Sequence, residues 1–326
     1  MNANAKPAAL GIDLGGSNIF SVVFDEENRP IAEDKVDTGA KQGYDAVIGR
    51  IRDQVARLDA AAADRGYHIE AIGLGVPGVT RGDEITFAPN LGWENVRPLQ
   101  DSGLSDRRAV LINDVNAGLL GELTRLDPVP PVVAAYFCGT GIGGAVAVNG
   151  QIVTGMSGGA GEVGHMVVKA NGKRVGGGLK GSLESYIGKW ALNGKIQKAL
   201  KSKKKTRLRE IITYNLGKTP VKSSTLKKGF EQDDQFTRRL LHYYVKYLSI
   251  GMSQTINLLS PNLIVLGGGI MEALGEQLLP DIRRKLQRYS VNELPELRLA
   301  ALGDLAGPLG AATQAREARV TTGVAG

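Results

Sequence analysis

The chain has 326 residues, of which 42% are hydrophobic and 22% are charged. This length is too great for one small hydrophobic core and suits two compact lobes. The one cysteine, Cys138, excludes a disulfide framework and a zinc site built from several thiolates. The first residues contain no apolar stretch typical of a signal peptide, and no run approaches the roughly 20 apolar residues of a membrane span. We therefore expect a cytoplasmic protein that is not bound to a membrane.

The net charge of +7 is concentrated in residues 195–209, KIQKALKSKKKTRLR. Such a basic run can attract nucleic acid, an acidic surface or a polyanionic substrate. We favour a solvated helix face and loop, since charge runs are usually that. No zinc-finger, zipper or recognition-helix pattern accompanies the run, and aromatic residues make up only 5% of the chain. A nucleic-acid partner is therefore not expected.

The first third of the chain predicts a sheet with covering helices. Apolar runs with glycine or proline at their ends predict strands, and apolar residues at helical spacing predict helices. The predicted strands cover residues 8–14, 18–25, 31–36, 71–78 and 108–114, and the predicted helices cover 43–65 and 116–123.

The pattern then starts again at residues 132–150, which predict a strand, a glycine turn, a second strand and an Asn-Gly turn. This order echoes residues 8–24 and indicates a weak internal repeat of architecture. Residues 182–260 are mostly helical in pattern. A strand running into a glycine turn and a helix is predicted at 261–270, then a last strand at 297–302 and a last helix at 306–318.

Three glycine turns follow apolar strands and are candidate phosphate-binding sites, because oriented backbone amides form a nest for anions. Taken alone, each is also an ordinary turn signal. The first turn is preceded by Asp13, which could hold a magnesium ion through water. In the second turn, Thr140 offers a hydroxyl to a transferring phosphoryl group. That turn runs into a strand and not into a helix, so we reject NAD binding. The candidate residues are Gly15, Gly16, Ser17 and Asn18 in the first turn, Gly139, Thr140, Gly141 and Gly143 in the second, and Gly267, Gly268 and Gly269 in the third.

Two further groups of polar residues are candidates for binding and chemistry. Asn113 and Asp114 end a predicted buried strand, where sites form in open α/β folds. The Asp114 carboxylate could accept the proton of an attacking sugar hydroxyl, although a helix N-cap role would also suit this position. Glu162, His165 and Glu184 lie in or near glycine-rich loops and suit sugar hydroxyls, while a structural role is the alternative for the histidine.

Eight motifs, taken in chain order, resemble the ROK family of repressors, open reading frames and kinases. They are GIDLGGSN at 11–18, GLGVPG at 73–78, NLGW at 90–93, NDVNAG at 113–118, GTGIGGAV at 139–146, SGGAGEVGH at 157–165, IVLGGG at 264–269 and GPLGAA at 307–312. The resemblance covers most of the chain. It implies the two-lobed α/β ATPase fold of actin and hexokinase, which is ribonuclease H-like. The expected lobes are residues 1–114 with 306–326, and residues 115–305.

The resemblance also implies the ligands and the residue roles. ATP and Mg²⁺ are the expected cofactors, with phosphates held by the first two turns and adenosine by residues 267–269. Asp114 would be the general base. The sugar hydroxyls would be held by Asn90, Asn113, Asp114, Glu162, His165 and Glu184. A small-molecule sugar is the expected partner, and a homodimer is the expected assembly because dimers are the commonest one.

Two departures from the family pattern bear on function. Many members carry a cysteine-rich zinc motif before the sugar-binding glutamate, but Val175, Gly177 and Ser182 occupy those positions here. We therefore expect an enzyme without zinc, with His165 freed for substrate or packing. A helix-turn-helix segment is not seen before the first strand, so the repressor branch is not expected.

The expected reaction is transfer of the γ-phosphoryl group of ATP to the 6-hydroxyl of a hexose, with glucose as the first choice. Mannose, fructose and N-acetylhexosamines are the nearest alternatives for the acceptor. Polyphosphate is an alternative donor, which the basic run at 195–209 motivates. The alternative from another class is a non-catalytic sugar sensor that keeps the fold.

Overall fold

A computed structural model describes residues 5–174, 179–202, 206–211 and 221–318 of the chain. Contacts divide the chain into two compact units. One consists of Met1–Val129, Ile152–Ala160 and Leu302–Gly326, and the other of Pro130–Gln151 and Gly161–Ala301. Each unit contains one five-stranded sheet. The lobe boundaries expected at 114/115 and 305/306 stay a prediction.

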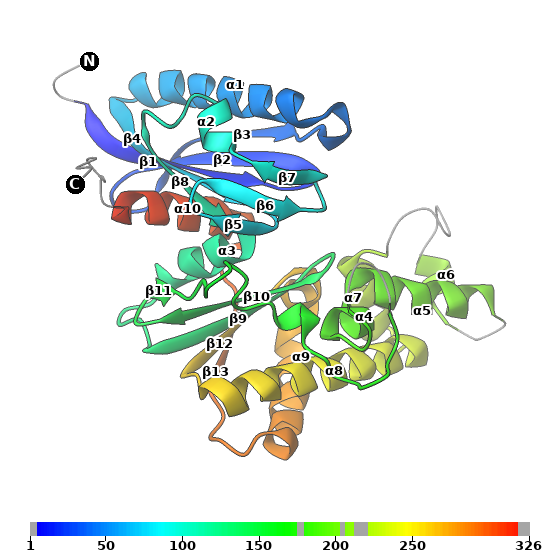
Figure 1. The fold of residues 1–326 in the computed structure, drawn as a ribbon. Helices are drawn as coiled ribbons and strands as arrows, with labels where there is room; N and C mark the ends of the chain where they lie inside the picture. Colours follow the sequence, from blue (N-terminus) through cyan, green and yellow to red (C-terminus); the bar gives the residue numbers. More distant parts are fainter. Residues whose placement is uncertain (1–4, 175–178, 203–205, 212–220, 319–326) are drawn as a thin grey trace. The chain divides into compact units, whose positions relative to one another are not determined.

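The sheet of the first unit has the order β3-β2-β1-β4-β8 (Figure 1). Its strands are β1 (Lys6–Leu14), β2 (Asn18–Phe24), β3 (Pro30–Asp37), β4 (Tyr67–Val76) and β8 (Arg108–Asn113). Strands β1, β4 and β8 are parallel, whereas β2 pairs antiparallel with both β1 and β3. The carboxyl ends of the three parallel strands therefore lie at one edge of this sheet, and this edge carries the candidate residues Asp13, Asn113 and Asp114.

Helices cover both faces of this sheet (Figure 1). Helix α1 (Tyr44–Ala63) packs its apolar stripe on one face, and α3 (Asp114–Leu123) and α10 (Ala306–Glu317) lie on the other. Glycines allow α10 to approach closely. A Cβ atom at Gly11 would lie 1.7 Å from the Pro308 carbonyl oxygen, and one at Gly73 would lie 1.9 Å from that of Ala311. No other residue fits at these two strand positions.

A small three-stranded sheet was not expected from the sequence. It consists of β5 (Val79–Arg81), β6 (Glu84–Ala88) and β7 (Trp93–Val96), and the short helix α2 (Pro98–Asp101) follows it. The buried side chains of Ile85 and Trp93 join the core of the first unit. Strands of three to five residues leave too short a pattern for periodicity to detect.

The sheet of the second unit repeats the first. Its order is β11-β10-β9-β12-β13, with strands β9 (Val132–Cys138), β10 (Ile142–Val148), β11 (Gln151–Ile152), β12 (Leu263–Gly267) and β13 (Glu296–Leu299). Strand β9 pairs antiparallel with β10 and parallel with β12, as β1 does with β2 and β4. The internal repeat expected from the sequence is confirmed. The strand expected at 297–302 is shorter and ends at Leu299.

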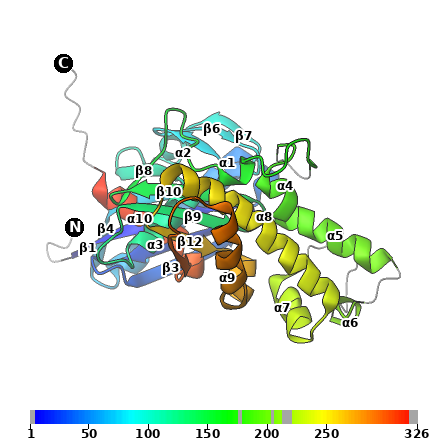
Figure 2. The same cartoon turned by 90° about the horizontal axis from the view of Figure 1, so that it is seen from below.

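Most of the helices belong to the second unit. They are α4 (Leu183–Ile187), α5 (Lys189–Lys201), α6 (Leu208–Ile211), α7 (Ser223–Glu231), α8 (Gln235–Leu259) and α9 (Gly269–Tyr289). Helix α8 buries a long stripe that includes Leu241, Tyr244 and Leu248 in the core of this unit. Figure 2 shows α5 running alongside α8. Three 3₁₀ turns, η1 (Ala40–Gln42), η2 (Val163–His165) and η3 (Gly303–Leu305), complete the described elements.

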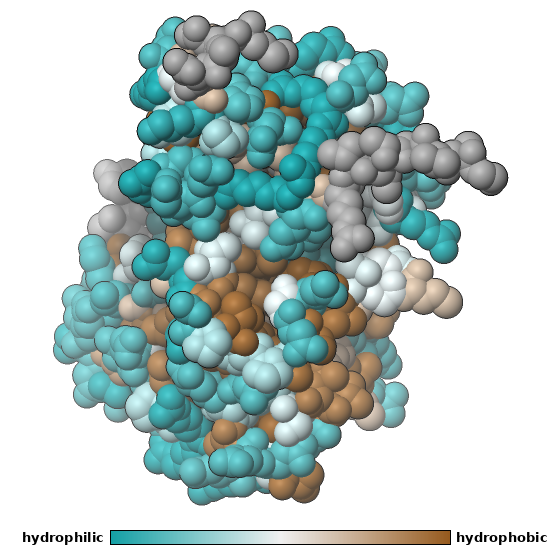
Figure 3. All heavy atoms as spheres, turned by 90° about the vertical axis from the view of Figure 1, so that its left-hand side faces the viewer, coloured by the Kyte–Doolittle hydropathy of each residue, from teal (hydrophilic) through white to brown (hydrophobic). Residues whose placement is uncertain are grey.

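The surface combines polar and apolar areas. On the face drawn in Figure 3, apolar residues gather in one broad area among polar ones. Among the helices in the described part of the chain, none combines the length and the apolar character that crossing a membrane requires.

Candidate active site

The first glycine turn joins β1 to β2 and is fixed by backbone contacts. The N–H of Gly15 donates to the Asn18 carbonyl at 2.9 Å. From the end of β3, the buried Thr38 holds the turn, because its hydroxyl donates to the Gly15 carbonyl at 2.6 Å and its N–H donates to the Ser17 carbonyl at 2.8 Å. A cavity of about 290 Å³ opens over the turn. It is lined by Asp13, Gly15, Gly16, Ser17, Asn18, Phe20, Lys35 and Asp304.

Two carboxylates in this cavity suit a divalent cation. The pKa of Asp13 is raised to about 6, mainly by burial and also by the nearby Asp304, while Lys35 opposes the shift. A carboxylate that is costly to ionise beside a second one is stabilised by a bound cation. Magnesium is bound by one or two carboxylates together with substrate phosphates, so Asp13 and Asp304 fit this ion without a third acidic ligand.

Asn113 and Asp114 lie at the carboxyl end of β8, where α3 begins. The Asn113 side chain is the N-cap of α3, since its Oδ1 accepts from the N–H groups of Val115 and Asn116. Its Nδ2 donates to the Gly78 carbonyl and to Asp114 Oδ1, both at 3.0 Å. Asp114 Oδ1 also accepts from the Val115 N–H at 2.9 Å. The cap is therefore Asn113, and the Asp114 carboxylate is held in a defined orientation.

Asp13 and Asp114 share one edge of the sheet. Asp13 pairs with Gly75 across β1 and β4, and Gly75 pairs with Ile112 across β4 and β8. Neighbouring strands lie about 4.8 Å apart, so Asp13 and Ile112 are roughly 10 Å apart across the sheet, and Asp114 follows Ile112 by two residues. Asn90, exposed in the loop between β6 and β7, also lies near this edge, because its carbonyl would be 3.9 Å from a Cβ atom at Gly16.

The second glycine turn joins β9 to β10 and is held by residues of α4 and α5. The Lys189 N–H donates to the Thr140 carbonyl at 3.1 Å, and the Ile142 N–H donates to Glu184 Oε2 at 2.9 Å. A Cβ atom at Gly141 would lie 2.3 Å from Glu184 Oε2, so a larger residue there would displace the Glu184 carboxylate. Glu184 thus supports the turn, a contact that the sequence did not indicate. Thr140 is exposed, and Gly143 pairs with Phe137 inside the hairpin.

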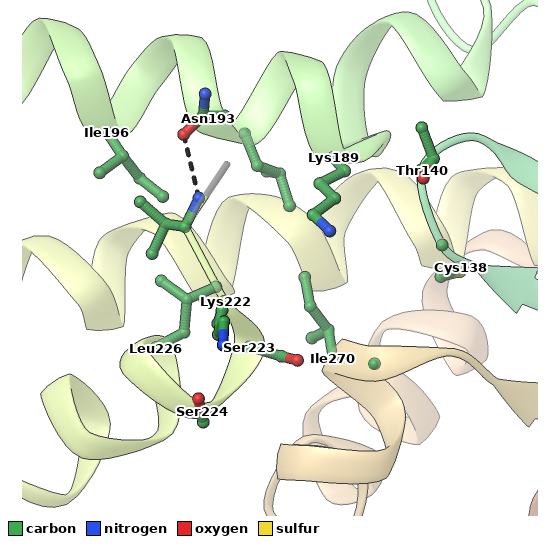
Figure 4. Close-up of a pocket in the computed structure, with 14 residues that line it drawn as sticks. Cys138, Thr140, Lys189, Asn193, Ile196, Lys222, Ser223, Ser224, Leu226 and Ile270 are labelled. Atoms are coloured by element: carbon green, nitrogen blue, oxygen red, sulfur yellow. Dashed lines mark hydrogen bonds between the residues drawn. The ribbon is translucent and has the colours of Figure 1, made fainter. Parts of the chain in front are cut away.

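Beside this turn lies a cavity of about 440 Å³, of the size of a small-molecule site (Figure 4). Its walls come from the end of β9 and the second turn, from α5, from the start of α7 and from the start of α9. The lining residues are Cys138, Gly139, Thr140, Lys189, Leu192, Asn193, Ile196, Val221, Lys222, Ser223, Ser224, Leu226, Gly269 and Ile270. Asn193 Oδ1 accepts from the Val221 N–H at 3.3 Å and ties two walls together.

Of the third glycine turn, only Gly269 lines this cavity. A Cβ atom at Gly267 would lie 2.5 Å from the Phe137 ring, and one at Gly268 would lie 2.3 Å from the Cys138 carbonyl oxygen. Gly268 also has a positive φ of 89°. Gly267 and Gly268 therefore let α9 begin close against β9 and shape the cavity indirectly.

Glu162 and His165 come together in the loop around η2. Their Oε2 and Nε2 atoms are 3.8 Å apart, and the side chains are 51% and 44% exposed. Between them, Val163 is buried against Gly144, where a Cβ atom would lie 2.4 Å from the Val163 side chain. The buried Val163 thus fixes this loop, and the side chains of Glu162 and His165 are open to solvent.

Of the three residues that replace the expected zinc-binding cysteines, the structure describes one. Val175 and Gly177 lie outside the described residues, whereas Ser182 is the N-cap of α4, accepting from the Ser185 N–H. Within the described ranges, no three side chains of His, Cys, Asp or Glu gather as a metal-binding group. The absence of zinc stays a prediction.

Several residues of these sites were missed from the sequence. They are Thr38, Lys35 and Asp304 at the first turn and Lys189, Asn193, Lys222 and Ser223 at the second cavity. Lys35 and Asp304 are 269 positions apart yet form an ion pair at 3.2 Å. Only Asp304 had a signal, because it lies just before the GPLGAA motif at 307–312.

Comparisons with known proteins identify the family. A model of the ROK family matches residues 9–318. The chain belongs to the ROK family. Glucokinase of Thermotoga maritima is 30% identical over 323 residues, which cover 96% of this chain and 98% of that protein. N-acetyl-D-glucosamine kinase of Citrobacter koseri is 29% identical over 318 residues, which cover 93% and 97%.

Solved structures agree with this assignment. The ROK hexokinase of Thermus thermophilus is 31% identical with a TM-score of 0.76, covering 94% of this chain and 96% of that one. The ROK glucokinase of Streptomyces griseus in complex with glucose and AMPPNP is 26% identical with a TM-score of 0.79, covering 95% and 100%. The predicted family and the actin/hexokinase-like fold are confirmed. The predicted enzyme class, a phosphotransferase with an alcohol acceptor, is confirmed with them.

Proposed function

We propose that this ROK protein transfers the γ-phosphoryl group of ATP to the 6-hydroxyl of a hexose, with glucose as the first choice. The observation that carries the proposal is the placement of Asp114. Its carboxylate is oriented by Asn113 at the same sheet edge as Asp13 and the first glycine turn. A fixed carboxylate beside a nest for phosphate is the arrangement that phosphoryl transfer needs.

In this mechanism Asp114 accepts the proton of the sugar hydroxyl as the hydroxyl oxygen bonds to the γ-phosphorus. The bond from that phosphorus to the bridging oxygen breaks, and ADP leaves with the electron pair. Amides of the first and second turns, with the Thr140 hydroxyl, stabilise the charge on the phosphoryl oxygens. Bound magnesium would neutralise part of the phosphate charge, and Asp13 and Asp304 are the residues that would hold it.

ATP is the proposed donor because the cavity of about 440 Å³ beside the second turn combines apolar and polar walls. Leu192, Ile196 and Ile270 suit a purine ring, and Asn193 and Ser223 suit polar groups of the nucleoside. Polyphosphate has no apolar group that could pack against such a wall. If polyphosphate replaced ATP with equal turnover, the assignment of the donor would be wrong.

The sugar is proposed to be held by Asn90, Glu162, His165 and Glu184 together with Asp114. Both hydrogens of the Asn113 side-chain amide are already donated to other groups. We therefore propose that Asn113 positions Asp114, and we place this role ahead of a direct contact with the sugar. N-acetylglucosamine is the second candidate acceptor, because relatives named for glucose and for N-acetylglucosamine are 30% and 29% identical.

The test is a coupled ADP-release assay with ATP and Mg²⁺ across hexoses and N-acetylhexosamines. We expect ADP release that depends on the sugar, with glucose giving the highest kcat/KM. A higher value for N-acetylglucosamine would select the second candidate. Silence with every sugar, with thermal stabilisation by one of them, would reject the kinase and favour the sugar sensor. The homodimer and the cytoplasmic location stay predictions.

A further inference from the structure

A second cavity of the second unit has no part in the proposed reaction. It has a volume of about 350 Å³ and lies between α5 and α8. Figure 2 shows these two helices side by side, and Figure 1 agrees. The lining residues are Lys195, Lys198, Ala199 and Ser202 from α5 and the loop after it, and Phe236, Arg239, Leu240 and Tyr243 from α8. We call this cavity the α5–α8 groove.

Helical spacing explains how the groove forms. The α5 residues follow at i, i+3, i+4 and i+7 from Lys195, and the α8 residues follow at the same spacing from Phe236. Residues at this spacing share one face of a helix. Two helix faces therefore line one space, with two lysines from α5 and with one arginine and mostly apolar or aromatic side chains from α8.

The groove collects positive charge. Lys195, Lys198 and Arg239 line it, and none of them belongs to an ion pair formed within the described ranges. The Lys195 amine lies 3.9 Å from the centre of the Tyr243 ring. Burial, with Lys173 and Lys198 nearby, lowers the pKa of Lys195. Gathered cations repel one another, and a bound anion removes this cost.

The groove also has an apolar wall and a limited size. Ala199 and Leu240 are buried, and Phe236 is half-buried beside them. A volume near the lower end of the range for ligand pockets fits a small molecule. Two lysines suit a phosphate as point charges, and the planar guanidinium of an arginine suits its oxygens in pairs.

We propose that the α5–α8 groove is a second ligand site, for a small phosphorylated compound with a ring or apolar body, and that α5 couples it to the nucleotide cavity. Lys198 and Arg239 bind the phosphate, and Phe236 and Leu240 contact the body of the ligand. The proposed site consists of described residues only. Residues 203–205 of the basic run lie outside the described ranges and are not part of it.

The coupling rests on α5, which serves both cavities. Leu192, Asn193 and Ile196 of this helix face the nucleotide cavity, and Lys195, Lys198 and Ala199 face the groove. Its first residue, Lys189, donates its N–H to the Thr140 carbonyl of the second glycine turn. A ligand that changes the preferred position of α5 must therefore change the affinity for nucleotide, and the effect is reciprocal.

Binding is tested with phenyl phosphate as the probe, by isothermal titration calorimetry of the full-length chain with saturating ADP. The ADP occupies the nucleotide cavity, so the probe reports on another site. The groove variant Lys198→Gln/Arg239→Gln should bind phenyl phosphate at least tenfold more weakly than the wild type. The matched control is Lys201→Gln/Lys246→Gln, which also removes one charge from each helix but lies outside the groove. It should bind as the wild type does.

Three results would overturn the site. The first is equal binding by the groove variant and the control, and the second is no binding to the wild type at millimolar probe. The third is equal affinity for inorganic phosphate, which has no apolar body and should bind at least fivefold more weakly. Circular dichroism of both double variants shows whether each is folded.

Coupling is tested by the dissociation constant of ADP with and without saturating phenyl phosphate. We expect a change of at least threefold in the wild type and in the control, and none in the groove variant. An unchanged dissociation constant in the wild type would overturn the coupling. Neither titration involves phosphoryl transfer, so failure of this inference is distinguishable from failure of the proposed function.

Discussion

The Asp114 carboxylate is placed by its own neighbours in the chain. Asn113 donates to one of its oxygens through Nδ2 while capping α3 through Oδ1, and the Val115 N–H donates to the same oxygen. One amide side chain thus both caps a helix and orients the carboxylate that we propose as the general base. This arrangement reduces the reorganisation that the carboxylate needs when substrate arrives.

Replacing Asp114 separates chemistry from binding. Asp114→Asn removes the proton acceptor but keeps the shape of the side chain, so kcat should fall by about 10²–10⁴, the range for general bases. The dissociation constant for sugar, measured by calorimetry, should stay within about threefold of the wild-type value, because most of the proposed hydroxyl contacts come from other residues. Asp106→Asn, at an exposed position away from the strand end, is the control and should leave both values unchanged. A kcat within tenfold of wild type would remove Asp114 from the role of base.

Asp13 makes a prediction about pH. The folded protein keeps a proton on Asp13 up to about pH 6, whereas the carboxyl in the unfolded chain loses it near the ordinary pKa of 3.8. Between these two values the folded state binds more protons, so this group's contribution to stability falls as the pH rises. Without nucleotide or magnesium, Asp13→Asn should raise the free energy of unfolding by about 1–3 kcal/mol at pH 8.

The gain from Asp13→Asn should vanish below about pH 4, where both states of the wild type are protonated. Urea denaturation at the two pH values measures the difference. A variant less stable than wild type at pH 8 would contradict the assignment of Asp13 as a costly buried charge. In the wild type, kcat/KM should also rise as the pH passes through about 6, because ionised Asp13 is the form that accepts a cation.

At the scale of elements, α10 is fitted into the first unit by glycines on both sides. Gly11 and Gly73 of the sheet leave room for the α10 backbone, and Gly310 of α10 leaves room for the backbone of α3. A Cβ atom at Gly310 would lie 1.7 Å from the Ala117 carbonyl oxygen. These contacts are backbone against backbone, so a side-chain rotation cannot relieve them.

Gly310→Ala should therefore lower the free energy of unfolding by about 3 kcal/mol or more, as overpacking against backbone does. Gly49→Ala is the matched control, because Gly49 also lies inside a helix, in α1, and nothing lies within 4 Å of its added Cβ atom. It should be neutral or gain up to about 1 kcal/mol from helix propensity. Urea denaturation followed by circular dichroism compares the two. Equal losses in both would show that helix packing is not the reason for Gly310.

The second glycine turn illustrates coupling between elements. Glu184 of α4 and Lys189 of α5 both contact the turn through hydrogen bonds to its backbone. The sequence predicted a sugar contact for Glu184 but could not reveal this support, because it joins residues 42 positions apart. The free oxygen of a carboxylate that accepts one N–H can still accept a hydroxyl, so the sugar contact stays a prediction.

At the scale of the whole molecule, the fold was largely predictable. Long buried strands with glycines at their ends, such as β1, β4 and β9, give strong patterns, and the eight motifs carry the family. The sheet of β5, β6 and β7 was missed because its strands are too short to show a period. Lys35 and Thr38 were missed for another reason, since tertiary packing alone brings them to the first turn.

The duplicated sheet order gives each unit a glycine turn at the same place in its sheet, and both turns are proposed to bind phosphate. In each unit, an antiparallel hairpin is continued by parallel strands in the same order. One turn has acidic residues beside it and the other has a cavity with apolar walls. Two copies of one architecture thus carry different side chains around their glycine turns.

The identity of the phosphorylated product tests the central claim most directly. The acceptor that supports the fastest ADP release would be incubated with ATP, Mg²⁺ and the protein, and the product examined by ³¹P–¹H correlation NMR. We predict a phosphorus coupled to the two hydrogens on carbon 6 of the sugar, formed in equal amount to ADP. Phosphorus on another hydroxyl, or ADP formed without any sugar phosphate, would contradict the proposed transfer to the 6-hydroxyl.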